Sequence, residues 1–111
     1  MSGVRITGIN LLDEWVTIEN KNHYDVDISG WRISDDKESN SYIFPEGRII
    51  RSEKMITIYT EPGSNNNNEL YWGINKDIWN DYGDTALLYD KDGKLRDSMT
   101  VQNQNGISEF K

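Results

Sequence analysis

The sequence predicts an all-β fold, an antiparallel β-sandwich of about seven to nine short strands. Apolar residues alternate with polar ones instead of recurring at helical spacing. The alternating runs are roughly four to seven residues long, and Gly, Asn, Asp and Ser separate them about every 8 to 12 residues. A small barrel fits the same pattern, and we favour the sandwich.

Before residue 50 the chain contains four alternating runs: VRITGI, EWVTIEN, DISGWRIS and SYIF. Successive side chains of a strand point to opposite faces, so residues two apart share a face. The pairs expected to share the inner face are Val4 with Ile6, Val16 with Ile18, Trp31 with Ile33, and Tyr42 with Phe44.

After residue 50 three further runs follow. KMITIYT places Ile56 and Ile58 opposite Met55, Thr57 and Tyr59. In DTALLYD either of two sets can share a face, Leu87 with Thr85 and Tyr89 or Ala86 with Leu88. The last run, KLRDSMTV, has its apolar residues at Leu95, Met99 and Val101. The residues that we expect to form the structural core are Val16, Ile18, Trp31, Ile33, Phe44, Ile56, Ile58 and Leu88.

Turn signals separate these runs. DKDG at 90–93 predicts a hairpin, because Gly93 can adopt the positive φ that a tight turn needs. Pro45 is expected to end a strand, since proline cannot donate to a sheet ladder. EPGSNNNNE at 61–69 predicts a mobile polar loop. The one helical turn that we expect lies in NKDIWND, where Asp77 suits an N-terminal position.

Length and composition predict one soluble domain. The 111 residues suffice for one core, which we place at residues 1–101, with a frayed tail at 102–111. Twelve basic and nineteen acidic residues give a net charge of −7, which argues against nucleic-acid binding. No apolar run approaches the roughly 20 residues of a membrane span, so we expect no membrane insertion and no targeting signal. Without cysteine the fold holds by packing alone.

Several motifs in a fixed order resemble the lamin tail domain family. They are GW at 30–31 after a D-x-S turn, FP at 44–45, the tryptophans Trp72 and Trp79, and GDTALLYDKDG at 83–93. The resemblance covers residues 4–101 and implies an immunoglobulin-like sandwich without catalytic activity, in which Trp31 takes the place of the buried signature tryptophan. Relatives are interaction domains, and prokaryotic ones are often appended to secreted or surface enzymes. The resemblance thus implies a prokaryotic-type module of a longer secreted or cell-surface protein.

Catalytic and metal chemistry have little support in the residues. The single histidine, His23, lies in a turn without a nucleophile beside it, so we expect no enzyme and no cofactor. Asp90, Asp92 and Asp97 are weak calcium candidates, but Lys94 stands where the calcium-loop pattern needs a further oxygen ligand. A solvated hairpin explains these aspartates better, and Asp35, Asp36 and Glu38 are read in the same way.

The aromatic residues supply the candidate binding surface. Trp72 and Trp79 lie in a connection of about 24 residues and are expected to staple it onto the sandwich, with exposed contact as the alternative. Trp15 points away from Val16 and Ile18, on a face expected to carry Tyr59 and Tyr89 as well. These aromatics either contact a partner or only stabilise the exposed sheet by cross-strand pairing. The residues that could contact a partner are Trp15, Tyr59, Trp72, Trp79 and Tyr82.

The sequence therefore favours a non-catalytic module that binds a protein or tethers a neighbouring domain to a surface. The alternative is a carbohydrate-binding module, in which exposed indoles stack on sugar rings. A purely architectural spacer is a third reading and DNA binding a fourth. An open sheet edge also allows a weak homodimer.

Overall fold

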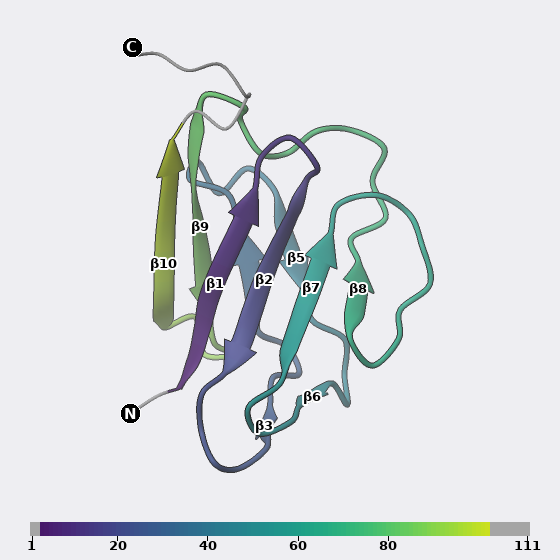
Figure 1. The fold of residues 1–111 in the computed structure, drawn as a ribbon, viewed down its shortest axis with the longest axis vertical. Coiled ribbons are helices and arrows are strands. Elements are labelled where there is room, and N and C mark those ends of the chain that lie inside the picture. The colour runs from purple at the N-terminus through teal and green to yellow at the C-terminus, as the bar shows by residue number, and fades with distance from the viewer. Residues whose placement is uncertain (1–2, 103–111) are drawn as a thin grey trace.

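The computed structural model describes residues 3–102 and shows two packed β layers (Figure 1). Within that range the chain forms ten strands and no helix, which confirms the all-β prediction. Two strands of only two residues raise the count above the predicted range. In chain order the strands are β1 (Val4–Asn10), β2 (Trp15–Asn20), β3 (Val26–Asp27), β4 (Arg32–Ser34), β5 (Ser41–Ile43), β6 (Ile49–Ile50), β7 (Met55–Tyr59), β8 (Glu69–Tyr71), β9 (Gly83–Tyr89) and β10 (Leu95–Gln102).

Two four-stranded sheets form the layers of the sandwich. The first has the order β1-β2-β7-β8 and the second β10-β9-β4-β5. A ribbon of β3 and β6 closes the lower end in Figure 1. The Gly93 turn joins β9 to β10 with φ of 81°, as the DKDG signal predicts.

The core lies between the two sheets, and all eight residues expected there are buried. In β9 the reading with Ala86 and Leu88 inward is correct, because both are 0% exposed. Leu95 is 49% exposed, whereas Met99 and Val101, the other apolar residues of this run, pack against the core. The register of β10 against β9 shifts between Leu95 and Asp97, and this shift changes which face the start of β10 presents.

The connection after β7 differs from the prediction. We expected a long crossover without a strand, but Glu69–Tyr71 forms β8, which pairs with β7 in parallel. The predicted antiparallel sandwich therefore contains one parallel pair. A parallel neighbour requires the chain to return to the end where β7 began, and residues 60–68 make that return. The predicted loop thus ends before Glu69.

Two further expectations concern the rest of the chain. The helical turn expected at 75–81 is absent, and backbone amides of this segment bond to a side chain of another loop instead. β10 reaches Gln102, the first residue of the expected tail, and residues 103–111 lie outside the described range. The described residues contain no helix long and apolar enough to cross a bilayer.

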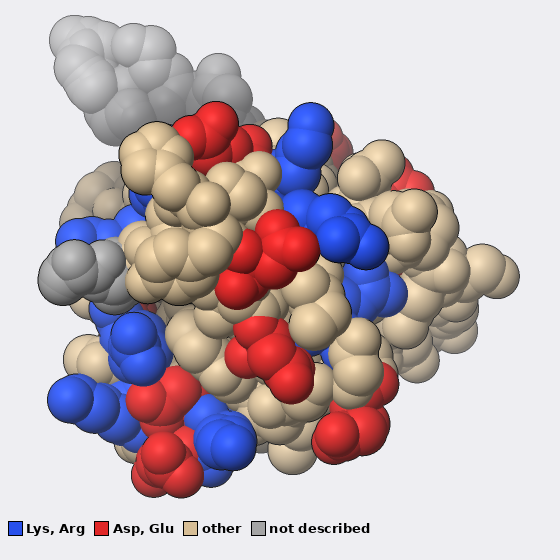
Figure 2. Space-filling view, turned by 90° about the horizontal axis from the view of Figure 1, so that it is seen from below, with Lys and Arg blue, Asp and Glu red and all other residues tan. Residues whose placement is uncertain are grey.

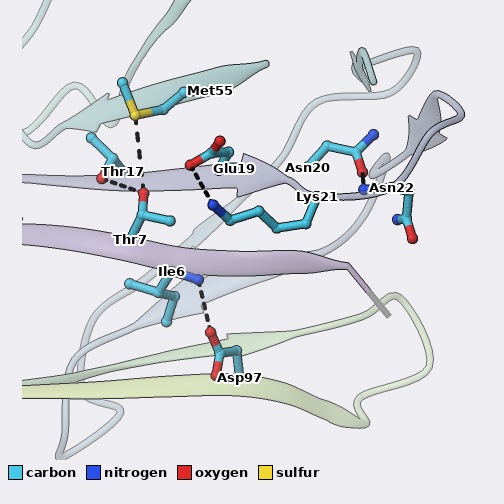
Figure 3. Close-up of polar contacts among 9 residues, drawn as sticks. All are labelled: Ile6, Thr7, Thr17, Glu19, Asn20, Lys21, Asn22, Met55 and Asp97. Atoms are coloured by element: carbon cyan, nitrogen blue, oxygen red, sulfur yellow. Dashed lines mark hydrogen bonds and ion pairs between the residues drawn. The ribbon is translucent and has the colours of Figure 1, made fainter. Parts of the chain in front are cut away.

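β1 and β10 are edge strands of the two sheets, and they pack against each other. The register of β1 shifts between Ile6 and Gly8. The Ile6 amide donates to Asp97 Oδ2 at 2.8 Å, as Figure 3 shows, and Arg5 Nη1 lies 3.7 Å from Asp97 Oδ1. Asp97 therefore links the two sheets at this edge.

Candidate functional site

Three aromatic side chains form a row across the outer face of the first sheet. Trp15 of β2 is opposite Tyr59 of β7 in the antiparallel register, and Tyr59 is opposite Tyr71 of β8 in the parallel register. The alternation that buries Val16 and Ile58 turns these three residues to the other face, where each is half-buried. We call Trp15, Tyr59 and Tyr71 the aromatic row.

The row is closely packed within itself. The rings of Tyr59 and Tyr71 stack with centroids 5.2 Å apart and an interplanar angle of 16°. Gly63 lies directly against the Tyr71 ring, because a Cβ there would stand 2.4 Å from the nearest ring carbon. At the other end a Cβ on Gly8 would lie 3.6 Å from the Trp15 ring. Stacking of this kind adds about 0.5–1.5 kcal/mol beyond burial and fixes the ring positions.

The same face becomes polar toward the start of β7 (Figure 3). Thr7 and Thr17 bond through their hydroxyls at 2.9 Å, and Thr7 Oγ1 donates to Met55 Sδ at 4.0 Å. Glu19 pairs with Lys21 at 3.1 Å. The face thus divides into an aromatic half and a polar half.

Carboxylates adjoin the aromatic half. The Tyr71 hydroxyl donates to Glu69 Oε1 at 3.3 Å, and the backbone amide of Tyr71 donates to Asn65 Oδ1 at 2.9 Å. Partial burial raises the pKa of the Tyr71 phenol, and the nearby Glu69 and Glu61 carboxylates raise it further. The phenol is therefore a neutral hydrogen-bonding group at the edge of the row.

The expectation that Tyr89 shares this face is wrong. Tyr89 lies on β9, which belongs to the second sheet. Its hydroxyl donates to Glu38 Oε2 at 2.9 Å, and the Arg32 guanidinium lies 4.0 Å from its ring centroid. Alternation gives the face of a strand but does not say to which sheet the strand belongs.

The tryptophans of the crossover lie at different depths. Trp79 is 2% exposed and packs into the core, so it offers no free ring face to a ligand. Trp72 is half-buried between Tyr42 and Trp79, with ring centroids 5.8 and 6.3 Å away. Both indoles hold the crossover against the sandwich. Tyr82 is 74% exposed in the turn before β9 and lies on neither sheet.

A buried glutamate fixes the crossover at the same end. Glu14, in the turn between β1 and β2, accepts the Ile78 amide at 2.6 Å and the Trp79 amide at 3.2 Å. Thr60 Oγ1 also donates to it at 3.4 Å. Burial raises the pKa of the Glu14 carboxyl, the two amides partly oppose that shift, and the neighbouring Asp77 adds to it. The backbone φ of Glu14 is 63°, a value that residues other than glycine rarely adopt.

The three aspartates considered for calcium do not converge. Asp90 accepts the amides of Asp92 and Lys94, while Asp97 faces the Ile6 amide across the sheet edge. Within residues 3–102 no group of three or more metal-binding side chains is arranged to hold an ion. The hydrogen bond from the Lys94 amide, with help from Arg96 and the Asp92 amide, lowers the pKa of Asp90, which suits a turn carboxylate.

His23 lies at the opposite end of the first sheet from the aromatic row. Its Nδ1 is 2.9 Å from Glu53 Oε2, and the His23 side chain is 91% exposed. An imidazole in open solvent beside one carboxylate has no enclosed site around it in which to position a reactant. This arrangement is an ordinary contact between two exposed side chains.

Sequence reasoning missed two residues at this end of the sandwich. Tyr71 could have been found by interpreting 69–71 as a short strand, in which Leu70 points into the core and Glu69 and Tyr71 point outward. Glu14 carried no comparable signal, because its role depends on the crossover returning beside the β1–β2 turn.

The described contacts thus give a packed β-sandwich whose outer face carries an aromatic row. The family model of the Lamin Tail Domain matches residues 2–103 of the chain. The search of curated proteins found no match to the chain.

Proposed function

The chain belongs to the lamin tail domain family, whose domains are generally non-catalytic, and from that premise we propose that it is a binding module that docks a protein partner through the aromatic row. The observation that carries the proposal is the register of Trp15, Tyr59 and Tyr71 on three adjacent strands. Tryptophan and tyrosine dominate binding energy at protein interfaces, because they bury a large area at low entropic cost.

The packing of the row supports a preorganised contact. Tyr59, Tyr71 and Gly63 hold one another in place, so a partner would order few side chains on docking. The Tyr71 hydroxyl and the Glu69 carboxylate at the rim can accept or donate polar contacts. An aromatic centre with a polar rim is the usual composition of an interface.

The same packing disfavours sugar stacking. A sugar ring needs a flat aromatic face open to solvent, but the Tyr71 ring is covered by Tyr59 and Gly63. The indole of Trp79, one of the candidate binding residues, is buried and offers no open face either. Protein recognition uses ring edges and hydroxyls as well as faces, so it fits the row better.

The test compares capture of partners by the wild-type domain and by Trp15→Ala and Tyr59→Ala variants. Tyr24→Ala is the matched control, because Tyr24 is 64% exposed and lies in the turn after β2, away from the row. A captured protein is then purified and titrated against each variant. We expect both row variants to weaken that affinity more than tenfold, or about 1.4 kcal/mol or more.

Thermal melting shows that each variant remains folded during the titration. Equal affinities of Trp15→Ala and wild type for the purified partner would contradict the proposal. Binding to a glycan array that Trp15→Ala abolishes would replace the protein partner by a carbohydrate.

A further inference from the structure

A groove separate from the aromatic row runs beside β6 and the start of β7. Its volume is about 530 Å³, within the range of ligand pockets. Residues 45–51 form one wall, Lys54, Met55 and Ile56 a second, and Asn67 and Asn68 the third. None of the three row residues lines it.

The charge of this groove is opposite to that of the chain. Arg48, Arg51 and Lys54 line it with a single acidic residue, Glu46. The whole chain has only 12 basic residues against 19 acidic ones. Figure 2, which views the lower end of the molecule, shows basic side chains in groups, with acidic side chains among and beside them. A local excess of positive charge on an acidic protein selects for an anionic ligand.

The two arginines of the groove are held in place with donors to spare. Arg48 Nη1 donates to the Asn66 carbonyl at 2.9 Å, and Arg51 Nη1 lies 3.1 Å from Asp25 Oδ2. A guanidinium has five N–H donors, so each arginine keeps others for a ligand. Lys54 makes no ion pair with any residue in the range 3–102.

The rest of the lining indicates a peptide. Ile49 and Met55 are 40% and 49% exposed beside the basic residues, a contact surface for aliphatic side chains. The exposed side-chain amides of Asn67 and Asn68 can bond to the N–H and C=O groups of an extended chain. The groove has no aromatic lining on which nucleobases could stack, and the net charge of −7 repels a phosphate backbone.

We propose that this groove binds an acidic peptide segment. Its carboxylates pair with Arg48 and Lys54, and its aliphatic side chains rest on Ile49 and Met55. This site is independent of the aromatic row, so the domain would have two contact surfaces.

The test is fluorescence anisotropy with a short labelled peptide of alternating acidic and aliphatic residues. A second peptide replaces Glu and Asp by Gln and Asn. We expect the acidic peptide to bind, the neutral one to bind at least tenfold more weakly, and affinity to fall as salt rises. Lys54→Gln should weaken binding about two- to fivefold, and adding Arg48→Gln should extend the loss to about tenfold or more.

Lys37→Gln is the matched control, because it removes one positive charge from an exposed turn outside the groove. It should leave the affinity unchanged, and amide chemical shifts of 45–56 and 67–68 should move on titration. Equal binding of the two peptides, equal losses in Lys37→Gln and Lys54→Gln, or shifts confined to the aromatic row would overturn the proposal. Tighter binding of an oligothymidine probe than of the acidic peptide would overturn it as well.

Discussion

Replacing Glu14 by alanine should strongly destabilise the domain. The carboxylate is the acceptor for the backbone amides of Ile78 and Trp79, at 2.6 and 3.2 Å, in a part of the fold where Glu14 is 8% exposed. Each amide left without a partner costs about 1–3 kcal/mol, so two cost about 2–6 kcal/mol. The shallow groove beside Glu14 can admit water, which places the loss toward the lower value.

Urea denaturation of the wild type and of Glu14→Ala measures this loss. Glu19→Ala is the control, because Glu19 lies on the outer face and its ion pair with Lys21 is at the surface. We expect the control to change the free energy of unfolding by less than about 1 kcal/mol. A loss below about 1 kcal/mol in Glu14→Ala would refute the view that this carboxylate holds the crossover.

The pH dependence of the free energy of unfolding is a second test of Glu14. Burial raises the folded-state pKa of Glu14 above its ordinary 4.5, so the folded protein binds this proton more tightly than the unfolded chain does. The stability that this group contributes is fully present below pH 4.5, the ordinary pKa of the carboxyl, and is lost as pH rises through the pKa that it has in the folded protein. The stability of the wild type relative to Glu14→Gln should therefore decrease as pH rises from about 4 to 7. An increase over that range would contradict the assignment.

Three other substitutions test the packing. Trp31→Ala removes an indole that is 6% exposed and should lower the free energy of unfolding by about 3–5 kcal/mol in urea titrations. Gly63→Ala places a methyl group 2.4 Å from the Tyr71 ring, so the loop or the ring must move, and the ring-current shifts of the aromatic row should change in proton NMR spectra. Asp97→Ala leaves the Ile6 amide without its acceptor and should cost about 1–3 kcal/mol, with faster exchange of that amide proton. Unchanged stability, spectra or exchange in the respective variant would count against each contact.

Alternation predicted the inner face of the strands well. Val16 with Ile18 and Ile56 with Ile58 are buried as predicted, because a strand on one side of a core has to turn every second residue inward. Leu95 departs from the rule because a register shift at the start of β10 changes the phase locally. Such a shift depends on the partner strand, which the pattern of one strand does not contain.

The candidate site was only partly predictable for the same reason. Trp15 and Tyr59 were correctly placed on an outer face, but Tyr71 joins them only through the parallel pairing of β8. Tyr89 has the same local pattern and lies on the other sheet. Pairing between strands distant in sequence decides which outward residues become neighbours.

Site-specific photocrosslinking tests the aromatic row as a contact surface most directly. A photoreactive amino acid replaces Thr57, which lies on the same outer face of β7 as Tyr59, or Ser98, which is exposed on β10 of the other sheet. The domain is expressed in its source cells, irradiated, and the adducts are identified by mass spectrometry. We expect one protein adduct from position 57, none from position 98, and loss of the adduct when Trp15→Ala is added. An adduct from position 98 alone, or one from position 57 that persists with Trp15→Ala, would contradict the account.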